Sequence, residues 1–110
     1  APMLGEVEVM SNPFTPNGDG INEFVELIVP VFKLLRSSAL VLNVYSLDGR
    51  RVRSITRSYE PAVGMRRITW NGRDDNGRLM PPGLYMCRVF IDVDAERGLS
   101  VVNKLVHSVY

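Results

Sequence analysis

Three oxygen-bearing side chains alternate along a short segment near the start of the chain that is rich in glycine and proline. They belong to Asn17, Asp19 and Glu23. Carboxylate and amide oxygens are ligands that calcium prefers, and backbone carbonyls help to complete its shell of about six to eight oxygens. The spacing therefore predicts a partial calcium site, to which Ile21 would add its carbonyl, with Asn22 as a spare ligand.

The same residues favour a second interpretation, in which they only hold their own loop. Asn and Asp side chains often accept a hydrogen bond from the backbone two residues on, as Asn17, Asp19 and Asn22 could do here. An EF-hand is excluded, because its glycine position falls on Asn22 and its twelfth position on Ile28. A full calcium shell would need waters or a second segment. The run Asp-Asp-Asn at 74–76 is the candidate, although it is also typical of a plain hairpin turn.

The other residues that could carry chemistry do not indicate an enzyme. The only cysteine, Cys87, lies in an apolar run, and the only histidine, His107, lies near the end of the chain in no catalytic motif. Acidic pairs occur at 74–75 and at 92 and 94, but hydrolytic carboxylates need a cleft and a fixed separation. We therefore expect no catalytic residues and no organic cofactor.

Length and composition indicate a single globular domain. With 110 residues, of which 45% are hydrophobic and 23% charged, the chain can bury a core without disulfides. A net charge of +1 gives no electrostatic reason to expect a nucleic-acid partner. No stretch reaches the roughly 20 apolar residues of a membrane span. We expect one domain over residues 1–110, as a module of a larger protein.

Turn signals divide the chain at regular intervals. They are the dipeptides Asn17-Gly18, Asp19-Gly20, Asp48-Gly49, Asn71-Gly72 and Asn76-Gly77. Between them lie short runs of branched and aromatic residues that alternate with a period of two, as strands do. Seven strands are predicted, over about 5–11, 23–35, 39–46, 51–58, 65–70, 84–93 and 99–109. No helical stripe is evident, and this spacing predicts an all-β sandwich of antiparallel strands.

The alternation also predicts the buried face of the strands. The expected core residues are Leu40, Leu42, Val44, Ile68, Trp70, Tyr85, Cys87, Val89 and Ile91. The pair Pro81-Pro82 cannot donate to a central ladder and so marks a crossing between sheets. The position of Tyr85 just after it predicts a tyrosine corner, in which the phenol bonds backbone across the crossing.

Four motifs run in order along the chain. They are NPFTPNGDGINE at 12–23, VYSLDGRRV at 44–52, WNGRDDNG at 70–77 and PPGLY at 81–85. Together they resemble the FlgD-like Ig domain family, which is related to the C-terminal part of the flagellar hook-capping protein. They are also similar to the C-terminal domains of bacterial secreted proteins linked to gliding motility and type IX secretion. The resemblance covers about residues 9–109.

This resemblance implies an immunoglobulin or fibronectin-III-like β-sandwich at the C-terminal end of a large protein, outside the cell or on the bacterial surface. It implies a non-enzymatic structural, sorting or attachment role, with parent domains and secretion or surface machinery as partners. In that family the first motif commonly ends in Asn-Asp, whereas here it ends in Asn22-Glu23. Hook capping is not implied, because it requires another region of the hook-capping protein.

A module that binds carbohydrate or protein is the alternative function. Sugar sites favour exposed rings beside polar groups, and Tyr45, Tyr59 and Phe90 are the candidates for exposed rings. Three such rings in one surface patch would favour this alternative. A partner strand could also add to an exposed sheet edge, but the sequence does not indicate which edge.

Overall fold

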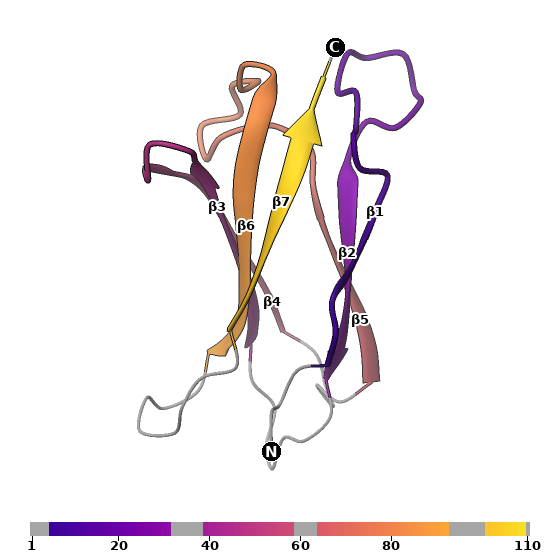
Figure 1. The fold of residues 1–110 in the computed structure, drawn as a ribbon, viewed down its shortest axis with the longest axis vertical. Helices are drawn as coiled ribbons and strands as arrows, with labels where there is room; N and C mark the ends of the chain where they lie inside the picture. Colours follow the sequence, from indigo (N-terminus) through magenta and orange to yellow (C-terminus); the bar gives the residue numbers. More distant parts are fainter. Residues whose placement is uncertain (1–4, 32–38, 59–63, 93–100, 110) are drawn as a thin grey trace.

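The computed structural model describes residues 5–31, 39–58, 64–92 and 101–109, which form two facing antiparallel sheets (Figure 1). The three-stranded sheet has the order β1-β2-β5, and the four-stranded sheet has the order β4-β3-β6-β7. The strands are β1 (Glu8–Met10), β2 (Val25–Val31), β3 (Ala39–Ser46), β4 (Arg51–Ser58), β5 (Gly64–Trp70), β6 (Gly83–Asp92) and β7 (Val101–Ser108). Seven strands and no helix occur in these ranges, which confirms the predicted fold class.

Most predicted strand bounds are close to the observed ones, and those of β3 and β4 agree at both ends. Strand β1 is shorter than predicted at both ends, and at its C-terminal end Ser11 adopts a left-handed φ of 61° that takes the chain out of the extended conformation. The predicted end of the second strand at 35, that of the sixth at 93 and the predicted start of the seventh at 99 lie outside the described residues.

The core lies between the two sheets, and all nine residues predicted for it are buried. Strand β2 shows the underlying alternation, because its buried and half-buried residues follow each other strictly. Strand β3 departs from it, since Val41 and Asn43 on its outer face are buried as well. The strand is central, between β4 and β6, and neighbouring side chains cover it. One of them, Ser54, donates its hydroxyl to Asn43 Oδ1 at 2.6 Å.

The chain crosses between sheets after β5, as the proline pair predicts. Strand β5 ends in the three-stranded sheet at Trp70, and β6 begins in the four-stranded sheet at Gly83. The phenol of Tyr85 donates a hydrogen bond to the carbonyl of Pro81, which confirms the tyrosine corner. This bond fixes the entry of β6 relative to the crossing segment.

Hydrogen bonds from a loop cover part of the outer edge of β4. The backbone of Asp75 donates to the carbonyl of Val52 at 3.0 Å, and its Oδ1 accepts from the backbone N–H of Ser54 at 3.0 Å. Further along, Arg57 Nη1 donates to the carbonyl of Thr56 at 3.2 Å. A covered edge is a poor template for pairing with another chain.

The described residues contain no helix long and apolar enough to cross a membrane.

Replacing Tyr85 by Phe should lower the free energy of unfolding by about 1 kcal/mol, because the corner hydrogen bond is lost and the Pro81 carbonyl loses its partner. Urea unfolding would measure the change. Tyr45→Phe is the matched control, since this half-buried ring lies on the outer face of the sheet, and it should change stability by less than about 0.5 kcal/mol. Equal stability of Tyr85→Phe and the wild type would contradict the structural role of the corner.

Candidate functional site

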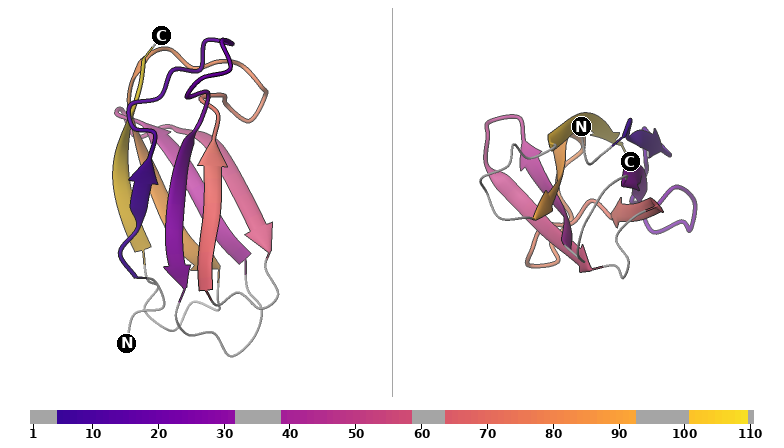
Figure 2. Two further views of the ribbon diagram at one scale, coloured as in Figure 1. Left: turned by 90° about the vertical axis from the view of Figure 1, so that its right-hand side faces the viewer. Right: turned by 90° about the horizontal axis from the view of Figure 1, so that it is seen from below.

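The sequence motifs meet at one end of the sandwich. Figure 1 places the loop between β1 and β2, the β3–β4 hairpin, the segment 71–82 and the end of β7 at this end. The left view in Figure 2 shows the loop between β1 and β2 and the end of β7 at this same end. Segments far apart in the sequence thus come together where β2 starts and where β5 and β7 end.

The loop between β1 and β2 is attached to the outer edge of β7. Phe14 forms a parallel bridge with Ser108, and its N–H donates to the carbonyl of His107 at 3.0 Å. Its own carbonyl accepts from the N–H of Val109 at 2.9 Å. Just before it, Asn12 Oδ1 accepts from the N–H of His107 at 2.9 Å. The loop therefore covers this end of the β7 edge as a strand would.

The same loop packs into the core and against the segment that follows β5. The ring of Phe14 is fully buried, edge-on to that of Trp70 with centroids 5.6 Å apart. Pro16 is buried against Gly72, where a Cβ would lie 3.0 Å from Pro16 Cγ. Because Gly72 also has a φ of 80°, glycine is the residue that fits both the conformation and the close approach.

Glu23, one of the predicted metal ligands, closes the tip of this loop. Both of its carboxylate oxygens accept from the N–H of Gly18, at 2.8 and 2.9 Å. One of them also accepts from the N–H of Gly20, at 3.2 Å. The N–H groups of two alternate residues thus hold this carboxylate, in the way that concave arrangements of backbone N–H groups bind anions.

The other predicted ligands form local turns. Asn17 Oδ1 accepts from the N–H of Asp19 at 3.1 Å, and Asp19 Oδ1 accepts from the N–H of Ile21 at 2.8 Å. The carbonyl of Ile21 accepts from the hydroxyl of Thr15 at 3.1 Å. Asn22 has a left-handed φ of 52°, and its carbonyl accepts from the N–H of Thr15 at 2.7 Å. These are the bonds expected of a loop that holds itself.

The five predicted ligands therefore lie in one loop. Those of their oxygens that form hydrogen bonds accept them from N–H and O–H groups of the same loop. Each oxygen has more than one lone pair, so these bonds do not use up its capacity to accept. Among the described residues, no group of three or more His, Cys, Asp or Glu side chains is placed to hold a metal ion. Calcium binding by this loop stays a prediction.

The run 74–76, considered as a second ligand segment, forms the hairpin turn that its composition also predicted. The N–H of Gly77 donates to the carbonyl of Asp74 at 3.0 Å, and Arg73 forms an antiparallel bridge with Leu79. Asp74 Oδ1 accepts from the N–H groups of Arg78 and Asn76, both at 2.9 Å. These bonds, that from Arg78 foremost, hold the pKa of Asp74 below its ordinary value of 3.8.

The cysteine and the histidine are not placed as a nucleophile and its base. Cys87 faces the core, and burial raises the pKa of its thiol to about 12, so the reactive thiolate is strongly disfavoured. His107 is exposed on β7, in register with Leu84 rather than with Cys87.

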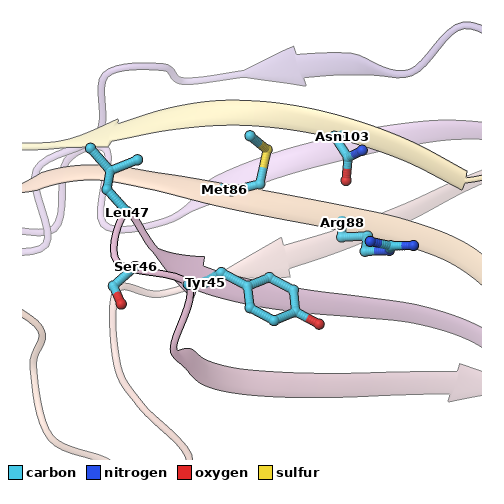
Figure 3. A pocket seen from close by; sticks show the side chains of 7 residues that line it. Tyr45, Ser46, Leu47, Met86, Arg88 and Asn103 are labelled. Carbon is cyan, nitrogen blue, oxygen red and sulfur yellow. The ribbon is translucent and has the colours of Figure 1, made fainter.

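A hollow on the outer face of the four-stranded sheet is a feature that the sequence did not indicate (Figure 3). Its volume is about 300 Å³, and its lining residues are Tyr45, Ser46, Leu47, Gly49, Met86, Arg88 and Asn103. Tyr45 was predicted only as an exposed ring. The signal that could have pointed to the hollow is the apolar Met86 at a position of β6 that the alternation assigns to solvent.

Two of the three rings expected to be exposed at a sugar site, Tyr45 and Phe90, are described by the structure, and both are half-buried and lie apart. Tyr45 and Phe90 lie on the same outer face, but the register places the row of Asn43 and Arg88 between them. Tyr59 lies outside the described residues.

Comparison with known proteins identifies the fold as immunoglobulin-like and then gives its family. A model of the FlgD Ig-like domain matches residues 34–91, just over half of the chain. The chain belongs to the FlgD Ig-like domain family. The match spans β3 to β6 and is narrower than the resemblance over 9–109, because the first motif, β1, β2 and β7 lie outside it. The search of curated proteins found no match.

Two solved structures share the fold. Dimeric latent PorU from Porphyromonas gingivalis is similar with a TM-score of 0.72 and 20% identity, over 94% of this chain but 9% of that one. FlgD from P. aeruginosa is similar with a TM-score of 0.55 and 20% identity, over 97% of this chain and 74% of that one. PorZ, a surface component of the P. gingivalis type IX secretion system, reaches a TM-score of 0.48 at 16% identity, over 94% of this chain and 11% of that one, which is too distant to carry an argument. The chain thus spans a small fraction of the length of PorU.

If the loop binds calcium, adding calcium should raise the midpoint of thermal unfolding, because the unfolded loop would bind the ion poorly. At a free calcium concentration of about 100 times the dissociation constant, the gain would be about 2.7 kcal/mol. Calorimetry with calcium against a chelator would measure it, with Asp19→Asn as the variant that should reduce the gain. An unchanged midpoint in millimolar calcium would reject the prediction.

Proposed function

We propose that this domain is a non-enzymatic module of a larger bacterial protein that is exported or displayed at the cell surface. Its role there is structural, sorting or attachment, in connection with type IX secretion. Membership of the FlgD Ig-like family carries the proposal. The likeness of the fold to a part of latent PorU, itself a much longer chain, supports it.

The arrangement of the loops supports a structural role. At the motif-bearing end, Phe14 covers the edge of β7 and Asp75 covers the edge of β4. Both edges of the four-stranded sheet are thereby protected in part against pairing with other chains. Such protection suits a module that must remain folded beside other domains during export and on a surface.

The use of the acidic side chains supports a role without catalysis. Glu23, Asp74 and Asp75 all accept hydrogen bonds from backbone N–H groups in their loops or on the β4 edge. A general acid or base must instead reach a substrate in a plausible pose. These carboxylates thus stabilise the loops that carry them and, in the case of Asp75, the contact of its loop with β4.

Fusion to a reporter tests the sorting role. We expect a periplasm-directed fluorescent protein carrying residues 1–110 at its C-terminus to reach the surface or medium of a host with type IX secretion. The same host without the secretion system, and the reporter without the domain, are the controls. A correctly folded fusion that stays in the periplasm of the competent host would contradict the sorting role and leave the structural one.

Protein binding is the second candidate function, and one observation favours it over sugar binding. The hollow on the four-stranded sheet is lined by a single ring, that of Tyr45, so it lacks the several rings of a sugar platform; its other lining residues are Ser46, Leu47, Gly49, Met86, Arg88 and Asn103.

A further inference from the structure

The outer face of the four-stranded sheet carries an apolar patch next to the β3–β4 hairpin. Tyr45 on β3, Met86 on β6 and Leu105 on β7 are successive partners in register. Leu84 lies two residues before Met86 on the same face of β6, and Leu47 lies two residues after Tyr45, in the hairpin. We call these five side chains the outer patch. Figure 3 shows Tyr45, Leu47 and Met86 together around the hollow.

The outer patch is not a chance scatter of surface residues. Three of its members are exposed large hydrophobics: Leu47 with 65% of its surface accessible, Leu84 with 43% and Leu105 with 49%. The strand register places them on three adjoining segments around the half-buried Tyr45 and Met86. Contiguous apolar surface with a hollow in it is typical of a site that another molecule covers.

Two arginines stand at the border of this patch. Arg51 is the register partner of Tyr45 on β4, and Arg88 follows Met86 on the same face of β6. Both are exposed, and neither has an ion pair or a side-chain hydrogen bond in the part of the chain that the structure describes. Elsewhere arginines do pair, Arg53 with Asp75 and Arg67 with Glu26. The patch thus offers two cations without a counter-ion.

The acidic residue nearest to the patch in sequence is already engaged. Asp48 accepts from the hydroxyl of Ser46 and from the N–H of Arg50 within the hairpin. These bonds, that from Ser46 foremost, hold the pKa of Asp48 below its ordinary value of 3.8, so it stays ionised at neutral pH within its own turn.

We propose that the outer patch docks a protein segment in which aliphatic side chains alternate with carboxylates. An aliphatic side chain would occupy the hollow between Tyr45, Leu47 and Met86, where the unbranched thioether of Met86 adapts to its shape. Flanking carboxylates would pair with Arg88 and Arg51, whose planar forks match a carboxylate with two parallel hydrogen bonds. An apolar centre with a charged border is the usual anatomy of a protein interface.

The charges select this occupant over a second copy of the domain. Pairing the patch with itself would place Arg51 and Arg88 of both copies in one interface, and like charges brought together there cost binding energy. The same two arginines would instead attract a segment that carries carboxylates. The inference rests on the second candidate function, protein binding at this hollow, whose partner it specifies, and it does not depend on the export role.

A titration with the full 110-residue chain tests the proposal. The probe is a blocked peptide of alternating aspartate and leucine, and the control peptide alternates lysine and leucine. We expect the amide signals of residues 45–49, 84–88 and 103–105 to shift saturably in NMR spectra with the first peptide only. Arg88→Glu should weaken binding at least about tenfold, because an attraction becomes a repulsion. Arg78→Glu, the same change at an exposed site in the 71–80 hairpin, should leave binding unchanged.

Several outcomes would overturn the proposal. They are the absence of saturation at millimolar aspartate–leucine peptide, equal binding of the lysine–leucine peptide, shifts centred elsewhere, and full binding by a folded Arg88→Glu variant. Leu105→Ser provides a second variant at the patch, should Arg88→Glu fail to fold. Sedimentation of the peptide-free domain should show a monomer. A dimer broken by Leu105→Ser would assign the patch to self-association instead.

Discussion

The burial of Trp70 at the motif-bearing end of the sandwich is the constraint on which the rest of the structure depends. Its ring is fully buried, and the rings of Phe14 and Tyr85 pack edge-on against it at centroid distances of 5.6 and 5.1 Å. Its Nε1 donates to the carbonyl of Arg73 at 2.8 Å, so the polar end of the indole also has a partner. One side chain thus ties both sheets and two loops together.

Each loop at this end takes its position from that cluster. Phe14 brings the first motif against Trp70, and the same residue then bonds along the edge of β7. The bond from Trp70 to Arg73 sets the start of the hairpin that sends Asp75 to the edge of β4. The polar residues that make the motifs conspicuous in the sequence therefore close the fold, and the outer face of the four-stranded sheet with Arg51 and Arg88 takes no part in this closure.

The strands could be predicted because their alternation reports burial directly. Leu40, Leu42 and Val44 face the core, as their alternate positions along the strand predict. The proline pair before Tyr85 predicts a crossing between sheets, because prolines cannot donate to a central ladder. Phe14 could not be placed in this way, because an apolar residue in a loop belongs to no periodic pattern. The contact of Asp75 with β4 was equally hidden, since a turn sequence reveals its local bonds and not its long-range ones.

The candidate site shows a different limit. Oxygens at alternate positions serve a cation or the loop's own N–H groups equally well, so composition alone left both interpretations open for Asn17 and Asp19. The structure adds what the sequence lacked, namely the direction of those oxygens toward backbone amides. The outer patch was missed because Met86 and Leu105 occupy positions that alternation assigns to solvent.

The central claim is that the acidic side chains of the first motif hold the loop through backbone amides, and Glu23→Gln in the presence of a chelator tests it most directly. The account predicts a loss of about 1 kcal/mol without any metal, because a carboxylate that accepts from Gly18 and Gly20 is replaced by a neutral amide. Equal stability of variant and wild type in chelator, with a difference only in calcium, would contradict the account and make Glu23 a metal ligand first.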